Sequence, residues 1–224
     1  MMVKIVTSKI QSYILKVIFH NLYHSFAWLY DLVAWIASAG KWTQWVNTSL
    51  PYIVGPRILE LGFGPGHLQG EMVSSDHDIF GLDESHQMVK VAIKNIQRHK
   101  KEIEQESKRN SLVQGKSQFL PYATGTFSTV VSTFPSPYII DINTVSEIER
   151  VLLPGGKLII IIGAKITGKR LIEKIAAWLM RITHQSLDNG EIISIPFTSS
   201  AFTFQLLEIN LVSSLVFLIQ AVKV

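Results

Sequence analysis

The stretch Ile58-Leu59-Glu60-Leu61-Gly62-Phe63-Gly64-Pro65-Gly66 leads an apolar run of strand length into three glycines at alternate positions, and a helical pattern follows. Glycine lets the backbone turn tightly and lets a ligand approach it without a Cβ atom in the way. The first turn of the helix also presents amide groups that lack an intrahelical partner. The stretch therefore predicts a strand, a ligand-binding loop and a helix, in that order.

A dinucleotide-binding loop and a purely structural turn both fit this stretch less well. A dinucleotide-binding loop requires another glycine three residues after Gly64, and that position holds His67. A purely structural turn between a strand and a helix does not need three glycines together with an acidic residue at Glu60. The loop is therefore expected to bind a ligand that is not a dinucleotide.

Downstream of the loop, short apolar runs alternate with helical segments, which is typical of a parallel sheet built from βαβ units. Strands are predicted over residues 57–61, 79–83, 112–114, 129–133 and 157–162, and helices over residues 66–73, 85–99 and 139–152. Segments 204–210 and 216–222 are too close together for a crossover helix, so they predict an antiparallel hairpin. The expected fold class is α/β, with a doubly wound, Rossmann-like, mostly parallel sheet of seven strands that ends in this hairpin.

The N-terminal part of the chain has a different pattern. Residues 10–36 carry apolar side chains at a period near 3.6, as amphipathic helices do. Pro51, Gly55 and Pro56 then mark a boundary. We therefore predict an N-terminal helical cap over residues 1–50, on the substrate side, and a ligand-binding domain over residues 51–224.

The bulk composition is that of a folded chain without cysteine chemistry. Of the 224 residues, 47% are hydrophobic and 17% are charged, which excludes general disorder. The absence of cysteine excludes disulfides and thiolate catalysis. No segment reaches the roughly 18 uninterrupted apolar residues of a spanning helix, so a cytoplasmic location is expected. The net charge of +4 comes without a basic stripe interleaved with aromatics, which disfavours nucleic-acid binding.

Five segments resemble, in order and in spacing, the motifs of class I S-adenosylmethionine-dependent methyltransferases. They are ILELGFGPG at 58–66, GLDESHQMVKVA at 81–92, LPYATGTFSTVVSTF at 120–134, EIERVLLPGGKLIIII at 147–162 and SSLVFLIQAVK at 213–223. The resemblance is to the branch that contains the ubiquinone/menaquinone-biosynthesis (UbiE-like) C-methyltransferases. It implies S-adenosylmethionine as cofactor, S-adenosylhomocysteine as product, a small-molecule acceptor and no metal.

The resemblance also implies roles for individual residues. Asp83, 17 residues after Gly66, would accept hydrogen bonds from both ribose hydroxyls, although it could instead cap the helix near Ser85. Met88 would pack on adenine, or would be a plain core methionine. Glu60 would orient the methionine ammonium group. The other residues implied to line the cofactor are Gly62, Gly64, Gly66, Glu84, Ser117, Gln118 and Thr133.

Two positions depart from the pattern of the branch. Relatives commonly carry an aspartate that accepts the adenine N6 protons, whereas this chain carries Lys116, which has no acceptor. Ser117, Gln118 or a backbone carbonyl would replace it, or cofactor affinity would be lower. Relatives also carry aspartate where this chain has Ser128. Two alternatives therefore stay open: a catalytically degenerate fold that only binds the cofactor, and an RNA or protein methyltransferase.

The acceptor side of the site is less defined by the sequence. A general base is needed only if the acceptor must lose a proton, and the candidates are His24, Tyr30 and Tyr138. Each could equally be a packing residue. A set of aromatic and proline residues suggests a lipophilic acceptor (a quinone precursor, a lipid or an aromatic metabolite), or else joins the cap to the sheet. They are Tyr13, Phe19, Tyr23, Phe26, Trp28, Tyr30, Trp35, Phe134, Pro135, Pro137 and Tyr138.

Three further patterns bear on membranes, nucleotides and metals. A mean hydropathy of +0.26, with Lys4, Lys9 and Lys16 ahead of the aromatic residues, suggests peripheral membrane contact through the N-terminal helices. Residues 163–170 resemble the sequence motif of a phosphate-binding loop, but an arginine stands where the Mg²⁺-binding hydroxyl is required. His20 and His24 have the spacing of a metal pair without an evident third ligand.

Overall fold

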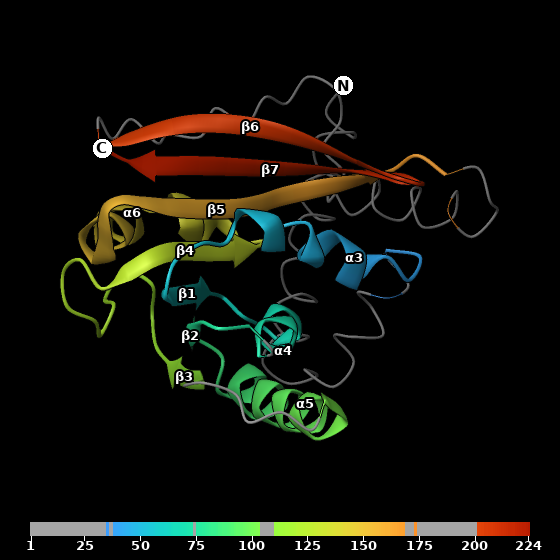
Figure 1. Ribbon diagram of the computed structural model, residues 1–224, viewed down its shortest axis with the longest axis horizontal. Coiled ribbons are helices and arrows are strands. Elements are labelled where there is room, and N and C mark those ends of the chain that lie inside the picture. The colour runs from blue at the N-terminus through green and yellow to red at the C-terminus, as the bar shows by residue number, and fades with distance from the viewer. Residues whose placement is uncertain (1–34, 36–37, 74, 104–109, 169–172, 174–200) are drawn as a thin grey trace, which may run out of the picture.

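Seven strands form one sheet in the order β3-β2-β1-β4-β5-β7-β6 (Figure 1). The computed structural model describes Trp35 and residues 38–73, 75–103, 110–168, 173 and 201–224. The strands are β1 (Arg57–Leu61), β2 (Asp78–Asp83), β3 (Asn110–Gln114), β4 (Phe127–Thr133), β5 (Leu152–Ile166), β6 (Phe202–Leu211) and β7 (Ser214–Lys223). The first five pair in parallel, and β7 pairs antiparallel with both β5 and β6. The predicted fold class is confirmed.

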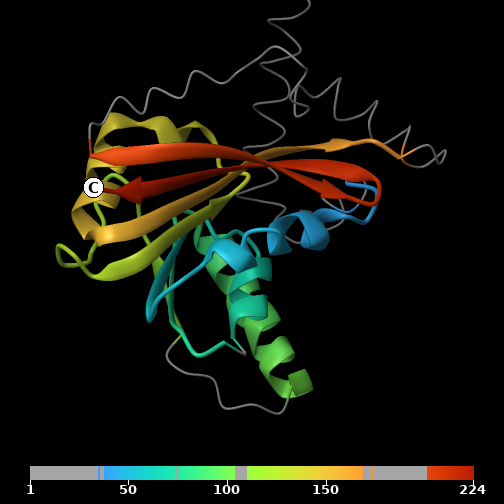
Figure 2. The same cartoon turned by 45° about the horizontal axis from the view of Figure 1, so that its top comes forward.

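Helices cover both faces of the sheet (Figure 2). They are α3 (Trp42–Asn47), α4 (His67–Met72), α5 (His86–Ile103) and α6 (Ile142–Val151), with the short 3₁₀ helices η1 (Leu50–Tyr52) and η2 (Pro137–Ile140). Because successive strand residues point to opposite faces, β1 divides its side chains between two cores. Leu59 and Leu61 pack in the same core as Ile148 of α6. Ile58 packs with Trp45 of α3 and Leu68 of α4 in the other core.

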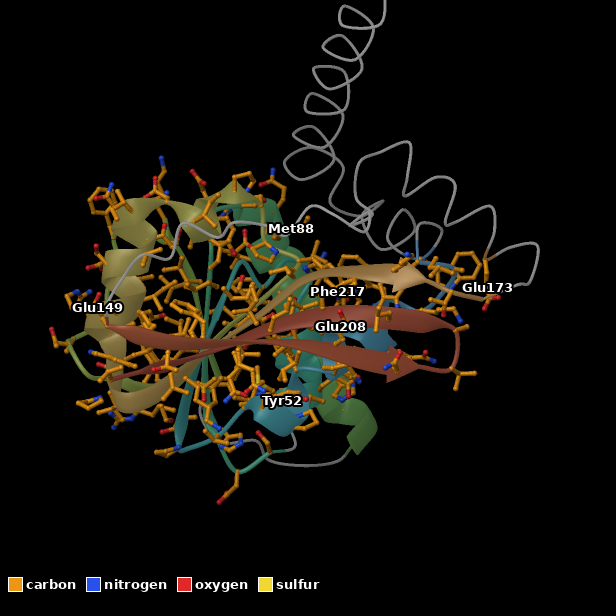
Figure 3. All side chains as sticks on the ribbon, turned by 90° about the horizontal axis from the view of Figure 1, so that it is seen from above. Tyr52, Met88, Glu149, Glu173, Glu208 and Phe217 are labelled. Atoms are coloured by element: carbon orange, nitrogen blue, oxygen red, sulfur yellow. The ribbon has the colours of Figure 1, made fainter. Side chains whose placement is uncertain are left out.

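The hairpin predicted near the C-terminal side extends the sheet beyond its parallel part. Glu208 of β6 lies opposite Phe217 of β7, and both are labelled in Figure 3. Along β7, buried residues alternate with less buried ones through Ser214, Val216 and Leu218. The strand β6 lies at the edge of the sheet and is mostly exposed.

Several predicted boundaries are wrong: α5 runs on from residue 99 to Ile103, β5 spans Leu152–Ile166 and not 157–162, and both ends of α6 differ. The helix predicted from residue 139 begins at Ile142, because Asp141 is its N-cap and accepts hydrogen bonds from the amides of Asn143 and Thr144. The helix also ends at Val151, since the chain enters β5 at Leu152. Pro154-Gly155-Gly156, which separates the predicted helix from the predicted strand, therefore lies inside a strand, where the pairing with β4 shifts in a bulge.

The described part of the N-terminal segment packs directly on the sheet. Trp45 of α3 is buried, and its Nε1 donates a hydrogen bond of 2.8 Å to Ser214 Oγ of β7. Trp42 stacks on Phe134, with ring centroids 4.5 Å apart. These three aromatic residues therefore join the described part of the N-terminal segment to the sheet, and Phe134 alone belongs to the aromatic set named from the sequence. The predicted helices of residues 10–36, including His20, His24 and Tyr30, lie outside the described residues.

Two sequence predictions concern segments that are only partly described. Residues 163–166 of the phosphate-loop pattern lie inside β5, so they form a strand and not the start of a strand–helix turn. Within the described ranges, no helix has the length and apolar character needed to cross a bilayer. Peripheral membrane contact through residues 1–34 stays a prediction.

Candidate functional site

The strand order reverses between β1 and β4, and ligands of such sheets bind at the carboxyl ends of the strands near this point. The pairing of β1 with β4 ends at Glu60 and Val131. Beyond it, β1 continues into the glycine loop and β4 continues into η2. The loop predicted from the sequence therefore lies where a parallel sheet of this order opens a crevice.

The glycine loop has a backbone that other residues would adopt only with strain. Gly62, Gly64 and Gly66 have φ angles of +68°, +52° and +82°. A Cβ atom on Gly66 would lie 2.9 Å from Ala92 Cβ of α5, so this glycine also allows α4 and α5 to approach each other. Gly66 is the N-cap of α4, and the loop turns directly into that helix. The positive φ angles agree with the tight turn that the sequence predicts, and the approach of a ligand to this backbone stays a prediction.

Asp83 joins the loop to the neighbouring strand. It is the last residue of β2 and is buried. Its Oδ2 accepts a hydrogen bond of 2.9 Å from the Gly64 amide, and its Oδ1 accepts one of 2.8 Å from the Ser85 amide. Asp83 thus holds the turn before α5, whereas Ser85 Oγ accepts the Met88 amide of the helix itself. A carboxylate offers about four lone pairs, more than these two hydrogen bonds use. Asp83 can hold the loop and accept hydrogen bonds from a ligand at once.

Glu60 lies on β1, directly before the residue that leads into the loop. Its side chain is buried, and Gln69 Nε2 of α4 donates a 2.9 Å hydrogen bond to its Oε2. Burial raises the pKa of Glu60 to about 8, against the hydrogen bond from Gln69, and the charge of Asp83 raises it further. At neutral pH the carboxyl group is therefore mostly protonated. A nearby cation would favour its ionised form.

Glu60→Gln is expected to remove a pH dependence of stability. The folded chain retains the Glu60 proton between its ordinary pKa of 4.5 and about 8, whereas the unfolded chain releases it. The free energy of unfolding of the wild type therefore falls as pH rises through this window. Above about pH 8 the variant should be more stable by about 2 to 4 kcal/mol, and the difference should vanish near pH 4. Urea denaturation across this pH range measures both values.

Glu147→Gln is the control with the opposite sign. The hydrogen bond from Arg150 lowers the pKa of Glu147, so its contribution to stability is lost as pH falls. This variant should be less stable at neutral pH, and the loss should disappear in acid. A Glu60→Gln variant with the same pH profile as the wild type would show that Glu60 is ionised in the folded chain.

The residues predicted on the adenine side lie together around the start of α5 and the loop after β3. Met88, labelled in Figure 3, is fully buried. Ser117 is buried against Thr144 of α6, with 3.0 Å between the hydroxyl oxygens. Lys116 lies 3.4 Å from Glu84, and both side chains are exposed. The lysine that departs from the family pattern therefore has a partner beside Asp83.

An open cavity of about 460 Å³ lies between this loop and the exposed side of α6. Its lining residues are Gln118, Phe119, Leu120, Asn143, Ser146 and Glu147. Phe119 is 78% exposed, and Ile140 at the end of η2 and Ile142 at the start of α6 are also exposed. Gln118 thus lines this cavity, whereas Thr133 ends β4 at the crevice and is half-buried. Exposed apolar side chains therefore lie on the segments that follow β3 and β4.

Tyr138 is the one candidate catalytic residue within the described residues. Its hydroxyl donates to the carbonyl oxygen of Leu61 at 2.9 Å and lies 2.9 Å from Ser132 Oγ. Burial raises the pKa of Tyr138 well above its ordinary value. The hydroxyl therefore stays protonated, which suits a hydrogen-bond donor and not a general base.

Sequence reasoning missed Ser132 and Gln69. Each is a buried polar side chain that contacts β1: Ser132 Oγ donates to the Leu61 carbonyl at 2.8 Å, and Gln69 reaches Glu60. The only local signal is a polar residue at a position where the neighbouring strand residues are apolar, as in Val130-Val131-Ser132.

Comparison with known proteins agrees with this site. Residues 59–160 match the family model of a methyltransferase domain. The chain is 30% identical over 119 residues to the uncharacterized methyltransferase YdaC of Bacillus subtilis (strain 168), covering 51% of this chain and 60% of that protein. It is 29% identical over 154 residues to demethylmenaquinone methyltransferase of Symbiobacterium thermophilum, covering 65% of this chain and 59% of the relative. The chain thus spans about three fifths of the length of these curated relatives.

A solved structure shares the fold. It is magnesium protoporphyrin IX methyltransferase of Synechocystis PCC 6803 with bound S-adenosylhomocysteine, with a TM-score of 0.62 and 15% sequence identity. The match covers 93% of this chain and 100% of that one. The family resemblance carried by the five sequence segments is confirmed.

Proposed function

We propose that this chain is a class I S-adenosylmethionine-dependent methyltransferase of the UbiE-like type, and that it transfers a methyl group from S-adenosylmethionine to a small-molecule acceptor. The observation that carries the proposal is the position of Asp83. It is a buried carboxylate at the end of β2, tied to the Gly64 amide at 2.9 Å beside the strand reversal. A ribose placed over this loop would meet an acceptor for its hydroxyl groups.

The residues of the crevice fit the parts of this cofactor. Gly62, Gly64 and Gly66 leave room for a ligand against the backbone, Asp83 offers acceptors, and Glu60 offers a buried carboxyl group to a cation. When bound, S-adenosylmethionine supplies a reactive methyl group on a positively charged sulfur. The chain then has to hold the reactants in line and keep water away. Since Tyr138 stays protonated, we assign it no part in proton removal.

An apolar acceptor is the finer part of this proposal. Support comes from the exposed apolar side chains of Phe119, Ile140 and Ile142 beside the crevice and the cavity next to them. Two relatives carry names that specify a ring-bearing acceptor, demethylmenaquinone and magnesium protoporphyrin IX. Phe134 gives no such support, because it packs between Trp42 and Trp45. We therefore place the acceptor on the side of the loops after β3 and β4.

Calorimetric titration with S-adenosylhomocysteine tests the cofactor part. We expect a dissociation constant in the micromolar range, equivalent to about −8 kcal/mol. Gly64→Arg, which puts a long side chain at a backbone with φ +52°, should abolish the heat of binding. Absence of binding to the wild type would contradict the proposal.

Transfer is tested by incubating the full chain, a methyl-labelled donor and an extract of apolar metabolites. Labelled product that disappears with Gly64→Arg supports a methyltransferase. Binding without transfer to any fraction would instead favour a degenerate fold that only holds the cofactor, the alternative raised by Lys116 and Ser128.

A further inference from the structure

Tyr138 covers the first glycine of the loop. The segment η2 brings the hydroxyl so close to Gly62 that a Cβ atom on this glycine would collide with Tyr138 Oη. The same oxygen lies 2.9 Å from the carbonyl oxygen of Leu61, at the carboxyl end of β1. Tyr138 therefore occupies the part of the crevice that lies between β1 and β4.

Three oxygen atoms contact one another at this point, but only two hydroxyl protons are available to form hydrogen bonds between them. Ser132 Oγ lies 2.8 Å from the Leu61 carbonyl oxygen and 2.9 Å from Tyr138 Oη, and Tyr138 Oη completes the triangle. The carbonyl has no proton and each hydroxyl has one, so two protons serve three contacts. One of the three contacts is thus an approach of two oxygens without a donor between them. A ligand that brings further protons would relieve it.

The surroundings favour a donor that is positively charged. Burial raises the pKa of Tyr138, the hydrogen bond to Ser132 lowers it, and the charges of Asp83 and Glu60 raise it. The charge of Asp83 therefore acts on this position, and Glu60 adds its charge only when it is ionised. Hydrogen bonds from a cationic donor to an oxygen are shorter and stronger than those from a neutral hydroxyl. An ammonium group suits the Leu61 carbonyl better than the phenol that occupies it.

The base of the segment that carries Tyr138 is fixed. Phe134 has a φ of +50°, which is unusual for a bulky residue, and its amide donates to the Ile161 carbonyl at 2.8 Å. Its ring also stacks on Trp42. A displacement of the Tyr138 hydroxyl therefore involves the tyrosine side chain and η2, while the start of the segment stays in place.

We propose that Tyr138 is a specificity-determining residue, whose hydroxyl occupies the Leu61 carbonyl until the ammonium group of a ligand replaces it. The competition lowers the affinity only for ligands with an amino-acid end, so Tyr138 reduces the preference for them over nucleosides that lack one. The inference rests on the proposed function, because the ammonium group is that of the cofactor. The tyrosine lowers the apparent affinity of such a ligand, because only the molecules in which the position is open can bind it.

The test compares two ligands on two proteins. Wild type and Tyr138→Phe are titrated with S-adenosylhomocysteine and with 5′-methylthioadenosine, which has the nucleoside and the sulfur without the amino-acid end. The variant keeps the ring and loses the competing hydrogen bond. Its affinity for S-adenosylhomocysteine should rise by about three- to tenfold. Its affinity for methylthioadenosine should stay within about twofold of the wild type, because that ligand leaves the tyrosine in place.

Two further variants make the result specific. Tyr122→Phe removes a buried tyrosine hydroxyl that has no hydrogen-bond partner among the described residues, and it should change neither affinity. Ser132→Ala removes the other proton donor to the Leu61 carbonyl and should raise only the affinity for S-adenosylhomocysteine, by a smaller factor. The inference would be wrong if Tyr138→Phe bound S-adenosylhomocysteine more weakly, or if the substitution changed both affinities equally. Either result would leave the proposed function unaffected. If neither ligand binds the wild type, the proposed function falls with it.

Discussion

Asp83→Ala should lower the affinity for S-adenosylhomocysteine by about a hundredfold, although it leaves the backbone of the glycine loop without a new side chain. The variant loses the acceptors for two ribose hydroxyls, and hydrogen bonds to charged groups contribute about 1.5 kcal/mol or more each. It also releases the Gly64 amide, which Asp83 Oδ2 holds at 2.9 Å, so the loop loses its anchor to β2. Together these losses correspond to about 3 kcal/mol of binding free energy. Calorimetric titration of both proteins measures the ratio.

Asp141→Ala is the matched control for the capping part of this effect. Asp141 also accepts two backbone amides, from Asn143 at 2.9 Å and from Thr144 at 3.2 Å, but it does so at the start of α6. Its loss should cost about 1 kcal/mol of stability and leave ligand affinity unchanged. If Asp83→Ala binds the ligand as tightly as Asp141→Ala does, Asp83 only caps the turn, and the ribose role is wrong.

Gly66→Ala is expected to be the most destabilising small substitution in the loop. Gly66 has a φ of +82°, a region that costs a residue with a Cβ atom about 1 to 2 kcal/mol. The new Cβ would also lie 2.9 Å from Ala92 Cβ and 3.2 Å from Ala92 Cα, so α4 and α5 would have to separate. Overpacking of this kind adds about 1 to 3 kcal/mol. Urea denaturation should show a total loss of about 2 to 5 kcal/mol.

Gly155→Ala separates the two causes. Gly155 has a similar φ of +72°, yet a Cβ atom there would meet nothing within 4 Å. This control carries the backbone penalty alone, so it should lose about 1 to 2 kcal/mol. Equal losses in the two variants would mean that the contact between Gly66 and Ala92 does not limit the packing of α4 against α5.

The features predicted correctly from the sequence depend on local patterns. The glycine loop follows from residue spacing, because the backbone angles at Gly62, Gly64 and Gly66 demand glycine wherever the rest of the chain lies. The hairpin of β6 and β7 follows from the short distance between two apolar runs. Asp83 is recognisable because it ends an apolar strand at a fixed distance from the loop.

The features that the sequence does not reveal depend on partners distant along the chain. Pro154-Gly155-Gly156 is typical of a turn, but its pairing with β4 keeps it within β5. Tyr138 and Leu61 are 77 residues apart, and their hydrogen bond exists only because β1 and β4 are neighbours. The partner of Lys116 also depends on the fold, which brings the ends of β2 and β3 together near Glu84. Local spacing therefore defines the loop, and tertiary packing defines what covers it.

The position of β7 between β5 and β6 has a consequence for the order of folding. β5 contains the run Leu158–Ile162, and until β7 arrives this strand has a bare edge with apolar side chains. Unpaired edges of this kind invite association between chains. The segment that covers the edge is synthesised about fifty residues later, and Lys223 then fastens it by donating to the carbonyl oxygens of Glu149 and Leu152. During synthesis on the ribosome, the edge of β5 is therefore unpaired until β7 has been made, and chaperones would bind the chain at this stage.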